Sequence, residues 1–202
     1  DSDPGIEHKL SSDAAALVNN ALAESGTETH FGKRVVSVDA EGIELSTGER
    51  VDASLVVWAA GMRAHPLTRT INAETDHLGR LKTDEYLAVN GFTGVYSAGD
   101  SAATKPDGIH TAPMSCQFAM PTGIIAGYNA VAELFQSERK PFFKDQYVTC
   151  IDLGKSGALF TLGWEGKPVM TGDDAKNMKK KIMNIIYPPA DAASLKKSGN
   201  PD

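Results

Sequence analysis

The stretch Thr93–Asp100 places the strongest constraint on how this chain folds. Val95-Tyr96 has high strand propensity, and the small pair Ser97-Ala98 lets another group approach the backbone closely. Gly99 permits a turn that a side chain would block, and Asp100 follows it directly. The pattern predicts a short buried strand with Asp100 at its carboxyl end, where open α/β sheets bind their ligands. An aspartate that only caps the next turn is the alternative interpretation.

A second ligand-binding strand end is predicted at residues 55–61. Leu55–Ala59 is a continuous apolar run, which is typical of a strand buried on both faces of a sheet. Ala60 and Gly61 follow it, and small residues at the end of such a strand let a ligand lie close to the backbone. Considered alone, these two residues are explained more simply as a tight exit into the next loop.

Three segments have the apolar spacing of amphipathic helices. The first follows the N-cap candidates at 10–13, the second covers Met114–Phe135, and the third covers Asp173–Tyr187. Pro121 falls inside the second segment, where proline kinks a helix or shifts its start. The free N–H groups at the start of a helix carry a partial positive charge of about half a unit. The start of the second helix can therefore stabilise an anionic group placed against it.

Short strands are predicted around these helices. Residues 27–31, 34–39, 43–45 and 51–53, with a turn signal at 46–49, predict a small antiparallel meander. Residues 78–84 predict a tight turn and a short strand. Tyr147–Leu153 and Ala158–Leu162 predict two further strands, followed by the short pair Val169-Met170. Residues 190–202 are small and polar, which predicts a disordered tail.

Composition excludes several classes of protein. The net charge is −6, whereas nucleic-acid-binding domains are usually basic. Cys116 and Cys150 are too few and too far apart for a disulfide framework or a zinc site, and no metal is predicted. No apolar run is long enough to span a bilayer, and no signal-peptide pattern stands at the N-terminus. A cytoplasmic protein is predicted.

Four segments together resemble the C-terminal part of a flavoprotein with two dinucleotide-binding domains. They are Val56–Ala64, Gly79–Leu87, Thr93–Asp100 and Met114–Gly123, and Cys150–Gly154 then resembles the beginning of the C-terminal domain. In this order and spacing they are most similar to the type II NADH dehydrogenase-like oxidoreductases of the pyridine nucleotide-disulfide oxidoreductase superfamily. The resemblance covers nearly the whole chain except the tail.

The resemblance implies an α/β fold, made of the C-terminal portions of two Rossmann-like FAD/NAD(P)-binding domains plus a small α+β C-terminal domain. The implied segments are a partial NAD(P)-binding domain at 1–72, a partial FAD-binding domain at 73–139, the C-terminal domain at 140–189 and the tail at 190–202. The implied activity is that of an NAD(P)H dehydrogenase, which passes hydride from NAD(P)H through FAD to an acceptor such as a quinone.

The resemblance also implies roles for single residues. Asp100 corresponds to the aspartate that binds the ribityl chain of the flavin, and Gly99 gives it room. Ala60 and Gly61 correspond to the backbone that passes near bound NAD(P)H. Four residues correspond to the helix start that faces the pyrimidine edge of the flavin: Met114, Ser115, Cys116 and Gln117. No residue is assigned a catalytic role, and packing is favoured over redox chemistry for Cys116 because no second cysteine lies nearby.

Two departures limit the resemblance. Membrane-bound quinone reductases carry a glutamine pair that lines the quinone site, where this chain has Pro121-Thr122, so quinone is one candidate acceptor among others. No G-x-G-x-x-G fingerprint occurs in the 202 residues, and this fingerprint cradles the pyrophosphate of the cofactor. We therefore expect a fragment, or the partner of an N-terminal half or second chain, with weak or no FAD binding alone.

The sequence leaves alternatives open. One is a non-catalytic flavoprotein fragment that acts as a binding or dimerisation module, such as a homodimer. A ferredoxin-reductase-like or apoptosis-inducing-factor-like flavoprotein fits residues 150–162 and the Lys-rich helix less well. Lys176–Lys181 beside Ile182, Ile185 and Ile186 would also suit peripheral contact with the inner face of the cell membrane, although a solvated helix face is the simpler interpretation. The acceptor, the choice between NADH and NADPH, and the oligomeric state are not specified.

Overall fold

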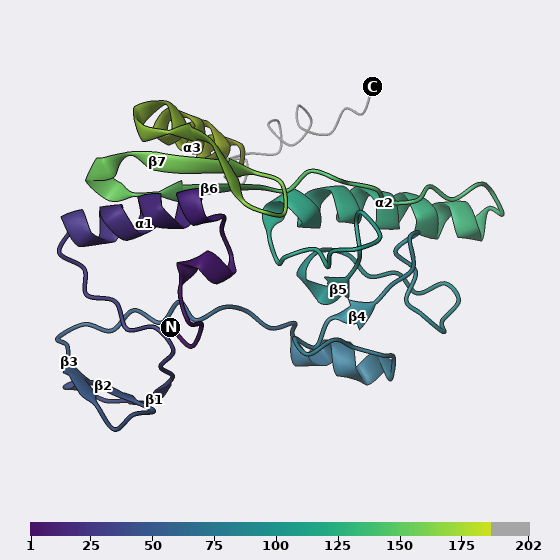
Figure 1. The fold of residues 1–202 in the computed structure, drawn as a ribbon. Helices are drawn as coiled ribbons and strands as arrows, with labels where there is room; N and C mark the ends of the chain where they lie inside the picture. The colour runs from purple at the N-terminus through teal and green to yellow at the C-terminus, as the bar shows by residue number, and fades with distance from the viewer. Residues whose placement is uncertain (187–202) are drawn as a thin grey trace. The chain divides into compact units, whose positions relative to one another are not determined.

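The computed structural model describes residues 1–186, which form two compact units (Figure 1). The first unit combines residues 1–54 with the chain from Gln146 onward, and the second is Leu55–Asp145. The predicted tail at 190–202 lies outside the described residues. The four domain segments predicted from the sequence remain a prediction. The two units are defined by contacts between residues, which do not show which cofactor a segment binds.

Helices and strands alternate irregularly along the described part of the chain. The helices are α1 (Ser12–Glu24), α2 (Cys116–Leu134) and α3 (Gly172–Ile186), with short 3-10 helices at Ile6–His8, Pro66–Ile71, Gly99–Ser101 and Gly154–Ser156. The strands are β1 (Val35–Val38), β2 (Gly42–Leu45), β3 (Arg50–Asp52), β4 (Leu81–Lys82), β5 (Ala102–Ala103), β6 (Val148–Asp152), β7 (Ala158–Leu162) and β8 (Lys167–Thr171). These bounds confirm the three predicted helices and most of the predicted strands.

In the first unit, α1 and α3 lie on opposite faces of an antiparallel sheet of order β6-β7-β8 (Figure 1). The core between these layers is made of small and branched side chains: Ala14, Ala15, Ala21, Ala158, Leu159 and Ala175. Gly157 lets the layers approach closely. It has a φ of +87°, and a Cβ there would lie 2.6 Å from the backbone of Gly172. The beginning of β7 and the beginning of α3 can therefore meet only without a side chain at this position.

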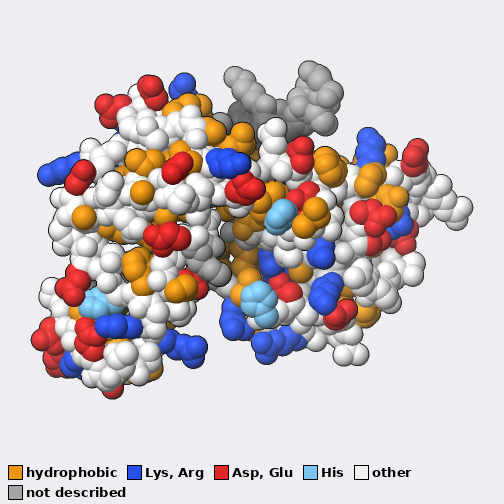
Figure 2. All heavy atoms as spheres, in the orientation of Figure 1, with side chains coloured by type: hydrophobic (Ala, Val, Ile, Leu, Met, Phe, Trp, Pro, Cys, Tyr) orange, Lys and Arg blue, Asp and Glu red, His pale blue; other side chains and the backbone are white. Residues whose placement is uncertain are grey.

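The meander of this unit is the antiparallel sheet β1-β2-β3. Figure 2 shows acidic and basic side chains intermixed over this part of the chain. Ion pairs join Arg50 to Asp39 and Lys33 to Glu49. Residues 27–31, predicted as part of the meander, are not a strand. The backbone next to them bonds to the N-terminal residues instead, since the Gly32 N–H donates to the Asp3 carbonyl at 2.8 Å.

The lysines of α3 are partly held against their own sheet. Lys176 Nζ lies 3.2 Å from an Asp152 carboxylate oxygen, and Lys179 Nζ donates to the Cys150 carbonyl at 2.8 Å. These two bonds engage two of the four lysines that the sequence marks as candidates for contact with a membrane surface. None of the described helices is long and apolar enough to cross a bilayer.

The second unit is built around α2. β4 and β5 pair in parallel, with Leu81 opposite Ala102. The regular strand predicted at Thr93–Asp100 is wrong, because this stretch forms only an isolated bridge between Tyr96 and Ala88. The partner segment cannot continue a ladder, since Leu87 has a φ of +66°, outside the range of a strand.

The buried strand predicted at Leu55–Ala59 is also wrong. The segment belongs to no sheet, and its side chains are exposed, with Leu55 at 78%, Val57 at 79% and Trp58 at 64%. A buried parallel strand needs neighbouring strands for its backbone and cover on both faces. Residues 1–186 supply neither to this segment, so its apolar composition alone does not make it a strand.

Candidate functional site

The turn that carries Asp100 lies directly against the first half of α2. The Gly99 N–H donates to the Thr122 hydroxyl oxygen at 3.0 Å. Gly99 has a φ of +59°, and a Cβ there would lie 3.4 Å from the Cβ of Ala119. A glycine therefore meets two demands here, a left-handed backbone and close packing on the helix.

Asp100 is exposed in the middle of the 3-10 helix Gly99–Ser101. Within the described part of the chain, its carboxylate accepts no hydrogen bond and forms no ion pair. The alternative role as a turn cap is therefore wrong for this residue. Both carboxylate oxygens remain available to hydroxyl donors of a ligand.

The start of α2 has no side-chain cap. Ser115 is the N-cap residue, but its hydroxyl does not accept from the helix backbone. In residues 1–186 the Ser115 Oγ is buried and has no hydrogen-bond partner. An unpartnered buried hydroxyl beside an uncapped helix start fits a ligand with polar, partly negative atoms at this place. The residues present therefore fit the pyrimidine edge of a flavin.

The structure brings only some of the other predicted site residues together. Met114 and Gln117 are half-buried beside Ser115, which agrees with a shared location at the start of α2. Cys116 is exposed in the described part of the chain, and the predicted packing role stays a prediction. Ala60 and Gly61 are exposed, and no hydrogen bond in the described residues joins them to α2 or to the Asp100 turn.

Sequence reasoning did not assign the contacts that three polar residues on one face of α2 make: Thr122, Asn129 and Glu133. Glu133 accepts hydrogen bonds from the Gly94 N–H at 3.1 Å and from the Tyr96 hydroxyl at 2.5 Å. Burial, together with the bond to Glu133, raises the pKa of Tyr96. The signal in the sequence was their spacing, because residues 122, 129 and 133 share one helical face with the buried Phe118 and Ala126.

A buried ion pair fixes the loop that leads into α2. Arg80 is 5% exposed. Its Nε donates to Asp76 Oδ2 at 2.7 Å, and its Nη1 donates to the Ala112 carbonyl at 2.6 Å. Ala112 also donates its N–H to the Thr104 carbonyl at 2.9 Å. The segment just before the helix start is therefore tied to the body of the unit.

Asp107 orders the same loop, and we expect its carboxyl group to titrate near pH 2. Its Oδ1 accepts from the N–H groups of Ile109 and His110, and its Oδ2 lies 2.7 Å from the His110 ring. Burial alone raises the pKa of Asp107, but these hydrogen bonds outweigh it and lower the value to about 2. Because the pKa of Asp107 is lowered in the folded chain, its carboxylate stabilises the loop at pH values above the ordinary pKa of 3.8. This stabilisation is lost as the pH falls towards 2. A side-chain carboxyl ¹³C titration checks this, and a midpoint near 3.8 would contradict it.

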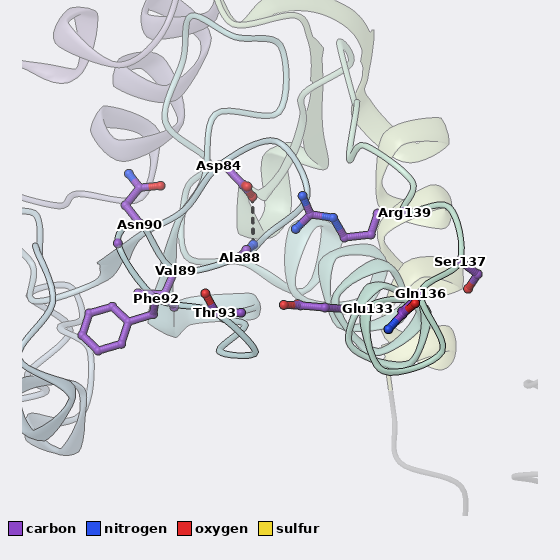
Figure 3. A pocket seen from close by; sticks show the side chains of 11 residues that line it. Asp84, Ala88, Val89, Asn90, Phe92, Thr93, Glu133, Gln136, Ser137 and Arg139 are labelled. Atoms are coloured by element: carbon purple, nitrogen blue, oxygen red, sulfur yellow. Dashed lines mark hydrogen bonds between the residues drawn. The ribbon is translucent and has the colours of Figure 1, made fainter.

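A hollow of about 630 Å³ lies beside the last turns of α2 (Figure 3). Figure 3 shows Arg139 and Glu133 on one side of it and residues Asn90–Thr93 on the other. None of the predicted cofactor residues lines it. Arg139 lies over the Tyr86 ring at 4.4 Å and Asp84 accepts from the Ala88 N–H at 2.9 Å, so these charged groups serve the local structure.

Comparison with known proteins gives the family. Residues 3–123 match the family described as pyridine nucleotide-disulphide oxidoreductase. An NADH dehydrogenase-like protein of Mycobacterium tuberculosis is 42% identical over 190 residues, which are 94% of this chain and 48% of that protein. A type II NADH:quinone oxidoreductase of Staphylococcus aureus is 30% identical over 177 residues, 82% of this chain and 42% of that protein.

A solved structure confirms the predicted fold class. The sulfide:quinone oxidoreductase from Aquifex aeolicus matches with a TM-score of 0.71 at 12% identity, over 91% of this chain and 47% of that one. The chain spans about half the length of the curated relatives it matches. The described residues contain no group of three or more histidine, cysteine or acidic side chains placed to hold a metal ion. On its sequence match and its fold, the chain belongs to the pyridine nucleotide-disulphide oxidoreductase family.

Proposed function

We propose that this chain is the C-terminal portion of an FAD-dependent NAD(P)H dehydrogenase. One observation carries the proposal. The bond from the Gly99 N–H to Thr122, at 3.0 Å, sets the Asp100 turn against α2, whose start has no side-chain cap. The two features that the resemblance assigns to one flavin therefore belong to one compact unit.

Each feature has a physical role in this proposal. The Asp100 carboxylate accepts hydrogen bonds from the ribityl hydroxyls, and a charged bond of this kind contributes about 1.5–3 kcal/mol. The start of α2 favours negative charge on the pyrimidine edge of the ring. Ala60 and Gly61 form the backbone wall beside NAD(P)H. When bound, FAD supplies the redox chemistry, taking hydride from NAD(P)H and passing electrons to an acceptor.

The acceptor is proposed as a small oxidant of the quinone class. Support comes from the Staphylococcus aureus relative, which is named as a type II NADH:quinone oxidoreductase. Pro121 and Thr122 stand where the quinone reductases carry their glutamine pair, so this chain would contact a quinone through other residues. The proposed location is the cytoplasm or the inner face of the cell membrane.

The rest of the site is proposed to come from an N-terminal half or a second chain. The Mycobacterium tuberculosis relative is about twice as long as the matching region. α2 exposes apolar side chains at helical spacing: Met120 at 60%, Ile124 at 69%, Val131 at 57% and Leu134 at 79%. Exposed apolar patches of this kind mark interaction sites. The partner would cover this face, pair with Leu55–Ala59 and supply the cradle for the FAD pyrophosphate.

A non-catalytic binding or dimerisation module is the second candidate, because the same apolar face of α2 can pack against another copy. Sedimentation of the purified chain separates the two. A stable homodimer that persists when the proposed N-terminal half is added would favour the module. A monomer that is captured by that half would favour the dehydrogenase.

We expect Asp100→Asn to weaken FAD binding about 10- to 100-fold in the assembled enzyme, where the chain is joined to the half proposed above. The change removes the negative charge and keeps the shape. Flavin fluorescence titration measures the affinity, and NADH oxidation with quinone and dye acceptors measures the activity. Asp145→Asn is the matched control, since Asp145 is an exposed aspartate of the same unit. Equal FAD affinity in both variants, or a full complement of flavin on the chain alone, would contradict the proposal.

A further inference from the structure

Thr122 lies at the centre of the contact between the Asp100 turn and α2. Its side chain is 1% exposed. The hydroxyl accepts from the Gly99 N–H at 3.0 Å and donates to the Phe118 carbonyl at 2.6 Å. Because a hydroxyl has a single proton, its donor is committed to α2 while its oxygen holds the turn.

Gly99 depends on this bond for a geometric reason. It is the first residue of the 3-10 helix Gly99–Ser101, and Ala98 before it offers no side-chain cap. The N–H at the start of such a turn needs a partner from elsewhere. Thr122 supplies that partner, and the Asp100 carboxylate begins only one residue further along the chain.

We propose that Thr122 is a positioning residue of the flavin site, which holds the Asp100 turn at a fixed distance from the start of α2. The inference rests on the proposed function, because it assigns the turn and the helix start to one bound FAD. A ligand that bonds to both needs their separation to match its own length. A turn that is free to move loses conformational entropy when the cofactor binds, and this cost lowers the affinity. A turn that is already fixed avoids the cost and therefore binds the cofactor more tightly.

The hydrogen bonds of Thr122 also make its hydroxyl unavailable to the electron acceptor. Its hydroxyl is buried, accepts from the Gly99 N–H and shares its one proton between the carbonyls of Phe118 and Ala119 at 2.6 and 3.2 Å, so it has no proton to offer a quinone. In this proposal Thr122 therefore holds the Asp100 turn on α2 and does not contact the acceptor.

Amide hydrogen exchange of the 202-residue chain tests the anchoring step. Thr122→Val keeps the shape and removes the hydroxyl, and we expect exchange of the Gly99 amide to accelerate about tenfold. Thr122→Ser keeps the hydroxyl and should stay within about twofold of the unchanged chain. Thr122→Ala replaces valine in the comparison if the valine variant does not fold.

Thr68→Val is the matched control, because Thr68 is 7% exposed and donates to the His65 and Gly79 carbonyls at 2.9 and 2.8 Å. It should lower stability without a specific effect on Gly99. Unchanged Gly99 exchange in Thr122→Val would overturn the proposal at this step.

FAD affinity of the assembled enzyme tests the functional step. We expect Thr122→Val to raise the dissociation constant about tenfold, Thr122→Ser to restore it and Thr68→Val to leave it unchanged. If Asp100→Asn weakens FAD binding and Thr122→Val does not, the positioning role is overturned while the proposed function stands. If neither variant affects flavin, the proposed function fails and this inference fails with it.

Discussion

Replacing Asp76 by alanine is expected to lower the free energy of unfolding of the second unit by about 3–5 kcal/mol. Asp76 is the partner of Arg80, whose side chain is 6% exposed and whose Nε lies 2.7 Å from Asp76 Oδ2. Since an arginine does not lose its proton in proteins, the variant leaves a buried charge without a partner. The carboxylate also accepts from the N–H groups of Leu78 and Arg80 at 2.9 Å. Urea denaturation measures the loss.

Glu74→Ala is the control for this prediction. It removes the neighbouring ion pair with Lys82, whose side chains are 66% and 42% exposed. Exposed pairs contribute little, so a loss below about 1 kcal/mol is expected. Similar losses in the two variants would show that burial of the Arg80 pair has no special energetic weight.

The pH dependence gives a second test of the same pair. Burial alone raises the pKa of Asp76, but the hydrogen bonds and charge of Arg80 outweigh it, so the pKa lies below its ordinary value of 3.8. A group with a lowered folded-state pKa stabilises the fold fully above the unfolded value and loses this effect as the pH falls through the folded value. The acid-side decline of stability should therefore be smaller in Asp76→Ala.

Replacing Asn129 by alanine is expected to lower the free energy of unfolding by about 2–4 kcal/mol. Asn129 is fully buried in α2. Its Nδ2 donates to the carbonyls of Tyr86 and Lys140 at 2.8 Å, and its Oδ1 accepts from the Lys140 N–H at 2.7 Å. The variant leaves three backbone groups without these partners, and a small cavity in place of the amide. Thermal and urea unfolding measure the effect.

Asn20→Ala on the surface of α1 is the matched control, because Asn20 is exposed and alanine favours a helix. It should change stability by less than about 0.5 kcal/mol. The Lys140 amide should also exchange faster in Asn129→Ala and not in Asn20→Ala. If Lys140 exchange is unchanged, Asn129 does not hold the segment after α2.

Local chemistry made several elements predictable. The N-cap at Ser11 precedes α1, and its hydroxyl accepts from the Ala14 N–H, as the sequence pattern indicates. α2 begins at Cys116, within two residues of the predicted start, and continues through Pro121. Gly99 adopts the left-handed backbone conformation that glycine favours. This was predictable because the conformation of a turn depends mainly on the residue itself and its nearest neighbours in the sequence.

The wrong strand predictions concern segments whose structure depends on residues far away in the sequence. Leu55–Ala59 has the composition of a buried strand, yet strand pairing requires neighbours that its own sequence cannot supply. The stretch Thr93–Asp100 forms one bridge instead of a strand, because its partner bends at Leu87. Periodicity describes which faces of a segment are apolar, and it does not state what covers them.

The sequence by itself determined the family, the three helices, and the glycine and aspartate of the candidate turn. Only the tertiary structure decided that Thr122 holds this turn on α2 and that Arg80 and Asp76 fix the approach to its start. The physical reason is the range of the interactions. Turn and cap preferences act over a few residues, whereas a buried hydroxyl or ion pair acquires its role from groups brought together by folding.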